Sequence, residues 1–165
     1  MNSKDIEQVV PRIFRAALIV GAVALFGGNA YAGECPADKV IKDSVTSGPD
    51  KPSGVTDMVI GSIDLAQKAV AFKGEQFRVR QLVIQPGGVV PWHSHGVRPA
   101  IIYIVKGSIT EYRSSCAVPI DHKSGEVTTE FGAELAHWWR NNSKEPTVLL
   151  SSDIFHDQSE DKHTM

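Results

Sequence analysis

The sequence has little of several features that identify common functional classes. Its 165 residues carry 17 lysines and arginines against 19 aspartates and glutamates, for a net charge of −2. The cations are scattered and form no basic stripe for phosphate groups, so we expect no nucleic-acid partner. A chain of this length, with 42% hydrophobic residues, fits one globular domain rather than two.

A hydrophobic run long enough to cross a membrane is also missing. The run AALIVGAVALF, residues 16–26, is shorter than the roughly 20 residues that a membrane-spanning helix needs. Basic residues precede it, and AYA at residues 30–32 follows as a small-residue cleavage site. Residues 1–32 are therefore predicted to be a cleaved signal peptide, and the mature protein to be periplasmic or secreted without membrane association. The alternative is a membrane anchor.

Cysteine is scarce, with only Cys35 and Cys116 in the chain. Both residues would reach an oxidising compartment after export, where a cysteine pair commonly forms a structural disulfide. We expect a bridge between them. The alternative is a free Cys116 that acts as a ligand or redox thiol.

No helical pattern persists in the mature chain. Short segments rich in Val, Ile and Thr alternate with turn signals over residues 57–156, which predicts an all-β domain. Residues 33–56 are polar and rich in Pro, Gly and Ser, typical of an N-terminal arm, and the polar residues 157–165 are expected to form a flexible tail. Lys106-Gly107 predicts a tight hairpin, and QPGGVVP at residues 85–91 predicts the end of one strand before the next.

Acidic residues are absent from PGGVVPWHSHGVRPAIIYIVKGSI, residues 86–109. The same stretch contains His93 and His95, whose spacing puts both side chains on one face of a strand. Two imidazoles in an apolar interior are costly when unpaired, and neutral imidazole is a good ligand for Zn, Fe, Mn, Cu or Ni. The pair therefore indicates a metal site, with a pair of surface histidines in a turn as the alternative.

The spacing around the histidine pair resembles that of the cupin superfamily. Gly87 and Gly107 flank the pair as in the first cupin motif, G-x5-H-x-H-x3-4-E-x6-G, and His137 and Asn141 match part of the second, G-x5-P-x-G-x2-H-x3-N. The resemblance implies a single cupin-type β-barrel, a jelly-roll-like double-stranded β-helix, over residues 57–156. It also implies a mononuclear metal on His93, His95 and His137.

The acidic ligand of the first motif is missing. Ala100 stands in its place, and Pro99 fills the only other permitted position. The ligand set is therefore predicted to be the three histidines. Two alternatives remain: a displaced carboxylate from Glu111, Glu130 or Glu134, and a pocket that has lost its metal.

Within the cupins, a three-histidine iron site is similar to the sites of the thiol dioxygenases and the diketone-cleaving dioxygenases. One hypothesis is therefore a non-haem dioxygenase for a small anionic or chelating molecule, with iron as the expected ion and Zn, Cu or Ni as alternatives. A second is a non-catalytic periplasmic binder of a metal or small molecule, and a third is a structural homodimer. Residues expected to line the substrate pocket are Arg98, Ala100, Ile102, Trp139 and Asn141, with Arg98 placed to hold a carboxylate.

Overall fold

The computed structural model describes residues 33–156, so the predicted signal peptide and the tail lie outside the described residues. The described part contains three short 3-10 helices: η1 (Ala37–Lys39), η2 (Leu65–Gln67) and η3 (Val70–Phe72). Its eight strands are β1 (Ser53–Asp64), β2 (Glu75–Ser94), β3 (Ala100–Lys106), β4 (Ser108–Arg113), β5 (Ile120–Lys123), β6 (Val127–Glu130), β7 (Ala136–Arg140) and β8 (Thr147–His156). Within this range no helix combines the length and the apolar character needed to span a membrane.

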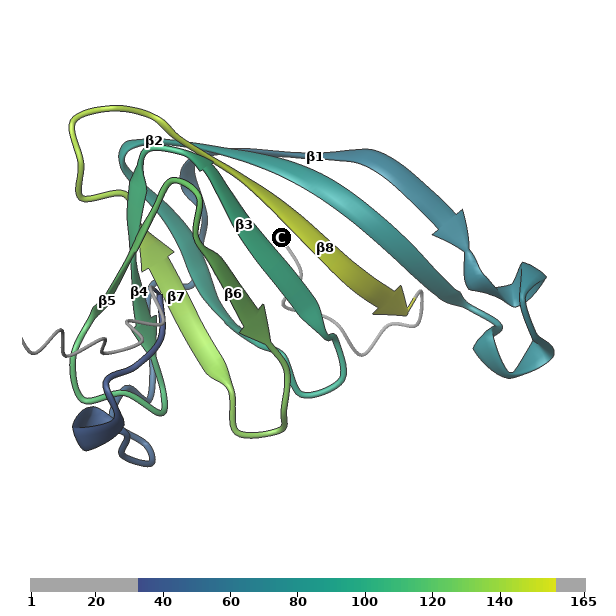
Figure 1. The fold of residues 1–165 in the computed structure, drawn as a ribbon, viewed down its shortest axis with the longest axis horizontal. Helices are drawn as coiled ribbons and strands as arrows, with labels where there is room; N and C mark the ends of the chain where they lie inside the picture. The colour runs from purple at the N-terminus through teal and green to yellow at the C-terminus, as the bar shows by residue number, and fades with distance from the viewer. Residues whose placement is uncertain (1–32, 157–165) are drawn as a thin grey trace, which may run out of the picture.

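The strands form one curled antiparallel sheet, which confirms the all-β prediction. Their order is β5-β4-β7-β2-β8-β3-β6, and β1 pairs with β2. The long strand β2 pairs with β1 and β8 along its first half and with β7 along its last residues. In Figure 1, β1, β2 and β8 extend past the shorter strands that curl around the other end. β2 therefore connects the two halves of the barrel.

The barrel interior is filled by alternate residues of these strands. β3 and β8 alternate between buried and more exposed positions, as expected for strands with one face inward. The buried apolar core comprises Leu82, Ile84, Val90, Ala100, Ile102, Ile104, Ile109, Trp139 and Leu149. Burial of each large apolar side chain stabilises the fold by roughly 1.5–3 kcal/mol. Because a register shift of one residue would turn these side chains outward, the alternation fixes which side chains face the barrel interior.

The predicted hairpin at Lys106-Gly107 is wrong. Gly107 has a positive φ of 84°, as a tight turn requires, yet β3 pairs with β6 and β8 while β4 pairs with β5 and β7. The chain turns at Gly107 and passes from one set of strands to the other. A two-residue turn signal reports a local change of direction but not the partner of the next strand.

The predicted strand end at residues 85–91 is also wrong, because β2 runs through it. A side chain at Gly88 would place a Cβ 2.8 Å from the main-chain oxygen of Gln85 and 2.9 Å from that of Gly54. Gly87 has a φ of 77° and donates a hydrogen bond from its main-chain nitrogen to the oxygen of Asn141. The two glycines therefore allow β2 to bend, so that its first half pairs with β1 and its last residues pair with β7.

The N-terminal arm is held against the barrel by a disulfide. Cys35 and Cys116 are bonded, with their Cα atoms 5.8 Å apart, as the cysteine pairing predicted. Val40 forms an isolated β-bridge with Cys116, and the main-chain nitrogen of Ser44 bonds to the oxygen of Ser114. The first strand already begins at Ser53, inside the segment expected to be an arm.

Reduction of this disulfide should lower the stability of the mature protein. The bond closes a loop of 81 residues, for which the chain-entropy account gives about 4 kcal/mol. Urea unfolding with and without reductant measures the change, and a Cys35→Ser/Cys116→Ser variant, insensitive to reductant, is the control. Equal unfolding midpoints for oxidised and reduced wild type would contradict the expectation.

Candidate metal centre

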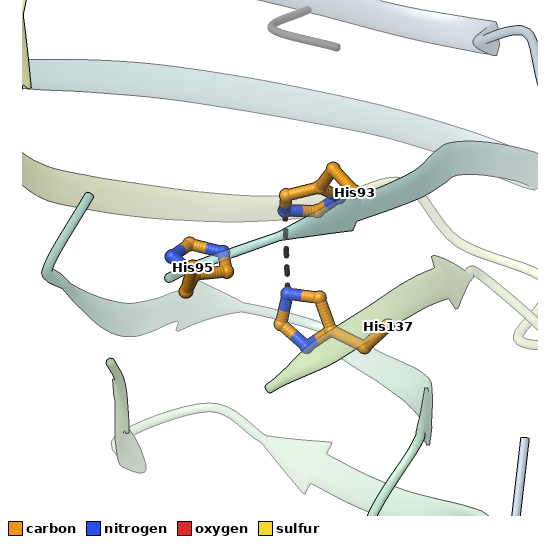
Figure 2. A group of neighbouring side chains, drawn as sticks. All are labelled: His93, His95 and His137. Carbon is orange, nitrogen blue, oxygen red and sulfur yellow. Dashed lines mark hydrogen bonds between the residues drawn. The ribbon is translucent and has the colours of Figure 1, made fainter. Parts of the chain in front are cut away.

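Three histidines converge inside the barrel. His93 lies near the end of β2, His95 follows just beyond it, and His137 lies on β7 directly across from His93. Their ring centroids are 4.6 to 4.9 Å apart, and each ring offers a ligand atom within 4.8 Å of the others. Figure 2 shows the three rings facing a common volume. The structure thus brings together the three residues that the motif spacing predicted.

Hydrogen bonds on the far side of each ring fix which nitrogen faces this volume. Each Nδ1 lies beside an oxygen that only accepts hydrogen bonds, so each Nδ1 carries a hydrogen and the lone pair is on Nε2. The acceptors are the main-chain oxygen of Pro91 at 2.8 Å from His93, that of Arg98 at 2.9 Å from His95, and Glu111 Oε1 at 2.5 Å from His137. This arrangement is typical of histidines that bind a metal through Nε2.

The Nε2 atoms of His93 and His137 lie 3.2 Å apart (Figure 2), and a cation must separate their lone pairs. Burial and then the neighbouring histidines lower the pKa of His93 well below its usual range and that of His95 to about 3. Burial opposes a charge on His137, but the carboxylates of Glu130 and Glu111 raise its pKa. A proton on His137 can therefore fill the gap, and a divalent metal ion can replace it.

Glu111 is the centre of a buried network behind His137. Its carboxylate accepts hydrogen bonds from Arg113 Nε at 2.7 Å, Arg113 Nη2 at 3.0 Å and His122 Nε2 at 3.0 Å. Burial works to raise the pKa of Glu111, but His122, His137 and Arg113 hold it well below its usual range. The carboxylate is thus anionic and keeps the hydrogen on His137 Nδ1, although the indole nitrogen of Trp139 also lies 3.3 Å from that atom.

The three candidates for a displaced carboxylate ligand have different positions. Glu134 is exposed and pairs with Lys42 at the surface. Glu111 binds the Nδ1 side of His137, away from the metal-facing nitrogen. Glu130 is 2% exposed, with Oε2 3.1 Å from His95 Nε2 and Oε1 3.6 Å from His137 Nε2. Among the three, only Glu130 faces the Nε2 atoms of His95 and His137.

A pocket opens beside the histidines. Its lining comprises Arg80, Leu82, Val90, His93, His95, Arg98, Ile102, Glu130, Trp139, Leu149 and Ser151. Three residues expected in a substrate pocket, Arg98, Ile102 and Trp139, are in this lining. Ala100 is buried outside it, and Asn141 holds main-chain oxygens of Ile84 and Glu145 at 2.9 and 2.8 Å. Asn141 therefore supports the loop between β7 and β8 rather than the pocket.

Arginine side chains and carboxylates form a second charged group in the barrel. Arg78 donates two hydrogen bonds to Asp153, at 3.0 and 2.8 Å, and Arg80 Nε lies 3.6 Å from the same carboxylate. Arg80 also pairs with Asp57 on β1 at 2.5 Å, and Arg98 Nε lies 3.9 Å from Asp153. Arg80 and Arg98 reach the pocket from this group, so they present positive charge to a ligand there.

Several of these residues were not found from sequence patterns. His122 lies outside both motifs, and its contact with Glu111 depends on the pairing of β5 with β4. Glu111 was considered from the sequence only as a displaced metal ligand, and Arg113 was not considered. Both share strand parity with the buried Ile109, which was the available signal that they point inward. Arg80 shares strand parity with the buried Leu82 and Ile84 on β2, which was the corresponding signal for an inward side chain.

The family follows from these features together with sequence similarity. Residues 80–153, which include all three histidines, match the family model of the cupin domain. Residues 80–153 are therefore a cupin domain, and the strands adopt the cupin fold. The cupin fold is shared with a Thermotoga maritima protein described as a predicted oxalate decarboxylase, at a TM-score of 0.52 and 17% identity. The match covers 70% of this chain and 98% of that one, and at this identity it shows the fold alone.

Two further cupin structures are similar at TM-scores of 0.48, too low to support any argument about function. One is the cupin domain of an XRE family transcriptional regulator from Enterobacter cloacae, 13% identical, over 64% of this chain and 100% of that one. The other is a sugar phosphate isomerase of the cupin superfamily from Silicibacter pomeroyi, 15% identical, over 74% and 75%. No curated protein sequence matches the chain significantly.

Replacement of Glu111 by alanine should destabilise the metal-free protein. The change removes the buried carboxylate that pairs with Arg113 and leaves only the partly exposed Glu34 at 3.5 Å, and loss of a buried partner typically costs about 3–5 kcal/mol. Urea unfolding in the presence of a chelator measures it. Glu134→Ala, at the surface, should change the free energy of unfolding by no more than about 0.5 kcal/mol. Equal effects of the two substitutions would contradict the role of Glu111.

Proposed function

We propose that this chain is an exported, metal-dependent cupin enzyme that acts on a small anionic molecule. The observation that carries the proposal is the convergence of three Nε2 lone pairs, each ring held by an acceptor on Nδ1, beside a pocket that two arginines reach. The donor set fits a divalent first-row ion, because neutral imidazole nitrogens suit Fe, Zn, Cu and Ni. Such an ion would supply Lewis acidity and open positions for substrate or O₂.

The chemistry of the pocket favours an anionic substrate. Leu82, Ile102 and Leu149 provide apolar walls, while Arg80 and Arg98 provide guanidinium groups suited to a carboxylate. Neutral histidine ligands leave the charge of the ion uncompensated, which also favours an anion. We infer oxidation by O₂ on iron, as in the three-histidine dioxygenases that the ligand set resembles, in the periplasm or outside the cell.

A non-catalytic binding protein is the second candidate function. Glu130 lies 3.1 Å from His95 Nε2, so a fourth protein ligand is available beside the three histidines. Four protein ligands close the coordination of a tetrahedral zinc ion, and closed sites are structural rather than catalytic. A tightly held zinc ion would favour this candidate.

Protein exported natively should contain about one first-row metal ion per chain. Elemental analysis measures the content, and export matters because cytosolic expression can load another ion and prevent the disulfide. His95→Ala and His137→Ala should each remove most of the bound metal, because each removes one of three ligands. His156→Ala is the matched control, since His156 pairs with Glu75 at the end of β8. Wild-type protein that binds no metal would rule out the proposal.

The iron-loaded protein should consume O₂ with carboxylate-bearing thiols, phenols or diketones. Each acid should bind about 10- to 100-fold more tightly than its methyl ester, because a hydrogen bond to a charged group is worth about 1.5–3 kcal/mol. Oxygen-electrode assays and competition binding measure both effects. Tight zinc or copper binding without O₂ consumption would favour the binding protein, and equal affinity for acid and ester would contradict the role of the arginines.

A further inference from the structure

Two buried carboxylates flank the position where the cupin motif places its acidic ligand. Ala100 on β3 pairs directly with Glu130 on β6 at one side and with Asp153 on β8 at the other. Directly paired residues of a sheet project from the same face. All three are buried, at 5%, 2% and 1% exposure. An acid missing from the expected strand is therefore present on both neighbouring strands, at the same level of the barrel.

The two carboxylates have different partners. Asp153 accepts hydrogen bonds from Nε and Nη2 of Arg78, and it lies close to Arg80 and Arg98. Glu130 faces His95 and His137. Across residues 33–156, Glu130 Oε1 and His95 Nε2 are both buried and both lack a hydrogen-bond partner. Asp153 is thus paired with arginines, whereas Glu130 and His95 contact each other at 3.1 Å and each retains a buried polar atom without a hydrogen bond.

The spacing of the metal-facing atoms suits one ion. Ligands bound about 2.1 Å from a metal stand about 3.0–3.4 Å from their neighbours in octahedral or tetrahedral geometry. Two measured separations fall in this range: 3.1 Å from Glu130 Oε2 to His95 Nε2 and 3.2 Å between His93 and His137 Nε2. The other oxygen of Glu130, Oε1, lies slightly farther, at 3.6 Å from His137 Nε2. An ion among these atoms would satisfy the two unpartnered groups.

We propose that Glu130, supplied by β6, is the carboxylate ligand of the metal in place of the acid that Ala100 replaces. The inference rests on the proposed function only in requiring a divalent ion at the three histidines. It adds one negative charge to the ligand set and favours an ion that accepts oxygen as well as nitrogen ligands, such as Fe²⁺. Ala100, the cross-strand partner of Glu130, projects from the same face of the sheet with only a small side chain.

The test compares four forms of the full mature chain: wild type, Glu130→Gln, the exchange variant Ala100→Glu/Glu130→Ala, and Glu134→Gln as the control. Co²⁺ is the probe, with affinity from competition against a chelator and coordination from the visible absorption spectrum. Glu130→Gln should weaken Co²⁺ binding by at least about 10-fold and change the spectrum, since loss even of outer partners of a metal ligand costs 10–100-fold. The exchange variant should regain most of the affinity, and Glu134→Gln should match wild type.

Thermal unfolding separates a ligand from a structural residue. Gln has the same shape as Glu and removes a buried acid, so metal-free Glu130→Gln should melt at or above the wild-type temperature, while its stabilisation by Co²⁺ is reduced. A folded Glu130→Gln with wild-type affinity and spectrum would overturn the inference. If that variant does not fold, recovery of affinity by the exchange variant supports the inference, and a folded exchange variant without recovery overturns it. Wild type that binds no Co²⁺ would instead overturn the proposed function.

Discussion

The contact between the metal-facing nitrogens of His93 and His137 is the constraint on which the site depends. Two lone pairs 3.2 Å apart repel each other unless a cation lies between them. Rotation of either ring would relieve the repulsion, but each Nδ1 is bound to an acceptor. For His93 the acceptor is a main-chain oxygen two residues away, so the local backbone fixes the ring. For His137 it is Glu111, which Arg113 and His122 hold in turn. The barrel thus holds both nitrogens toward one volume, as a group of residues able to bind a metal requires.

The barrel interior contains two charged groups with an apolar region between them. The histidines and Glu111 depend on β2, β4, β5 and β7, while Arg78, Arg80 and Asp153 depend on β1, β2 and β8. Leu82 and Leu149, paired across β2 and β8, belong to the apolar wall of the same pocket. Buried charges are costly unless each is paired, and both groups satisfy this requirement largely through arginine and carboxylate contacts. A ligand in the pocket would therefore meet metal, guanidinium and apolar surface together.

The sequence allowed prediction of the features that depend on short intervals along the chain. Motif spacing identified His93, His95 and His137, and the cysteine pair predicted the disulfide. Features that depend on strand partners were predicted less well. The turn at Gly107 was correctly assigned a positive φ, but strand pairing shows that it joins two different sets of strands. Asn141 keeps its motif position, yet its amide donates hydrogen bonds to the main-chain oxygens of Ile84 on β2 and Glu145 in the loop between β7 and β8, which no motif spacing predicted.

The pair of Ala100 and Glu130 explains why an absent motif residue does not imply an absent ligand. Paired residues of adjacent antiparallel strands have Cβ atoms about 4.5–5.5 Å apart, a gap that the side chain of a glutamate can cover. A metal ion responds to the position and charge of an oxygen atom and not to the strand that supplies it. If Glu130 fills this role, the ligand set has the charge of a carboxylate-bearing cupin site. The preference for anions must then come from Arg80 and Arg98, not from an uncompensated ion.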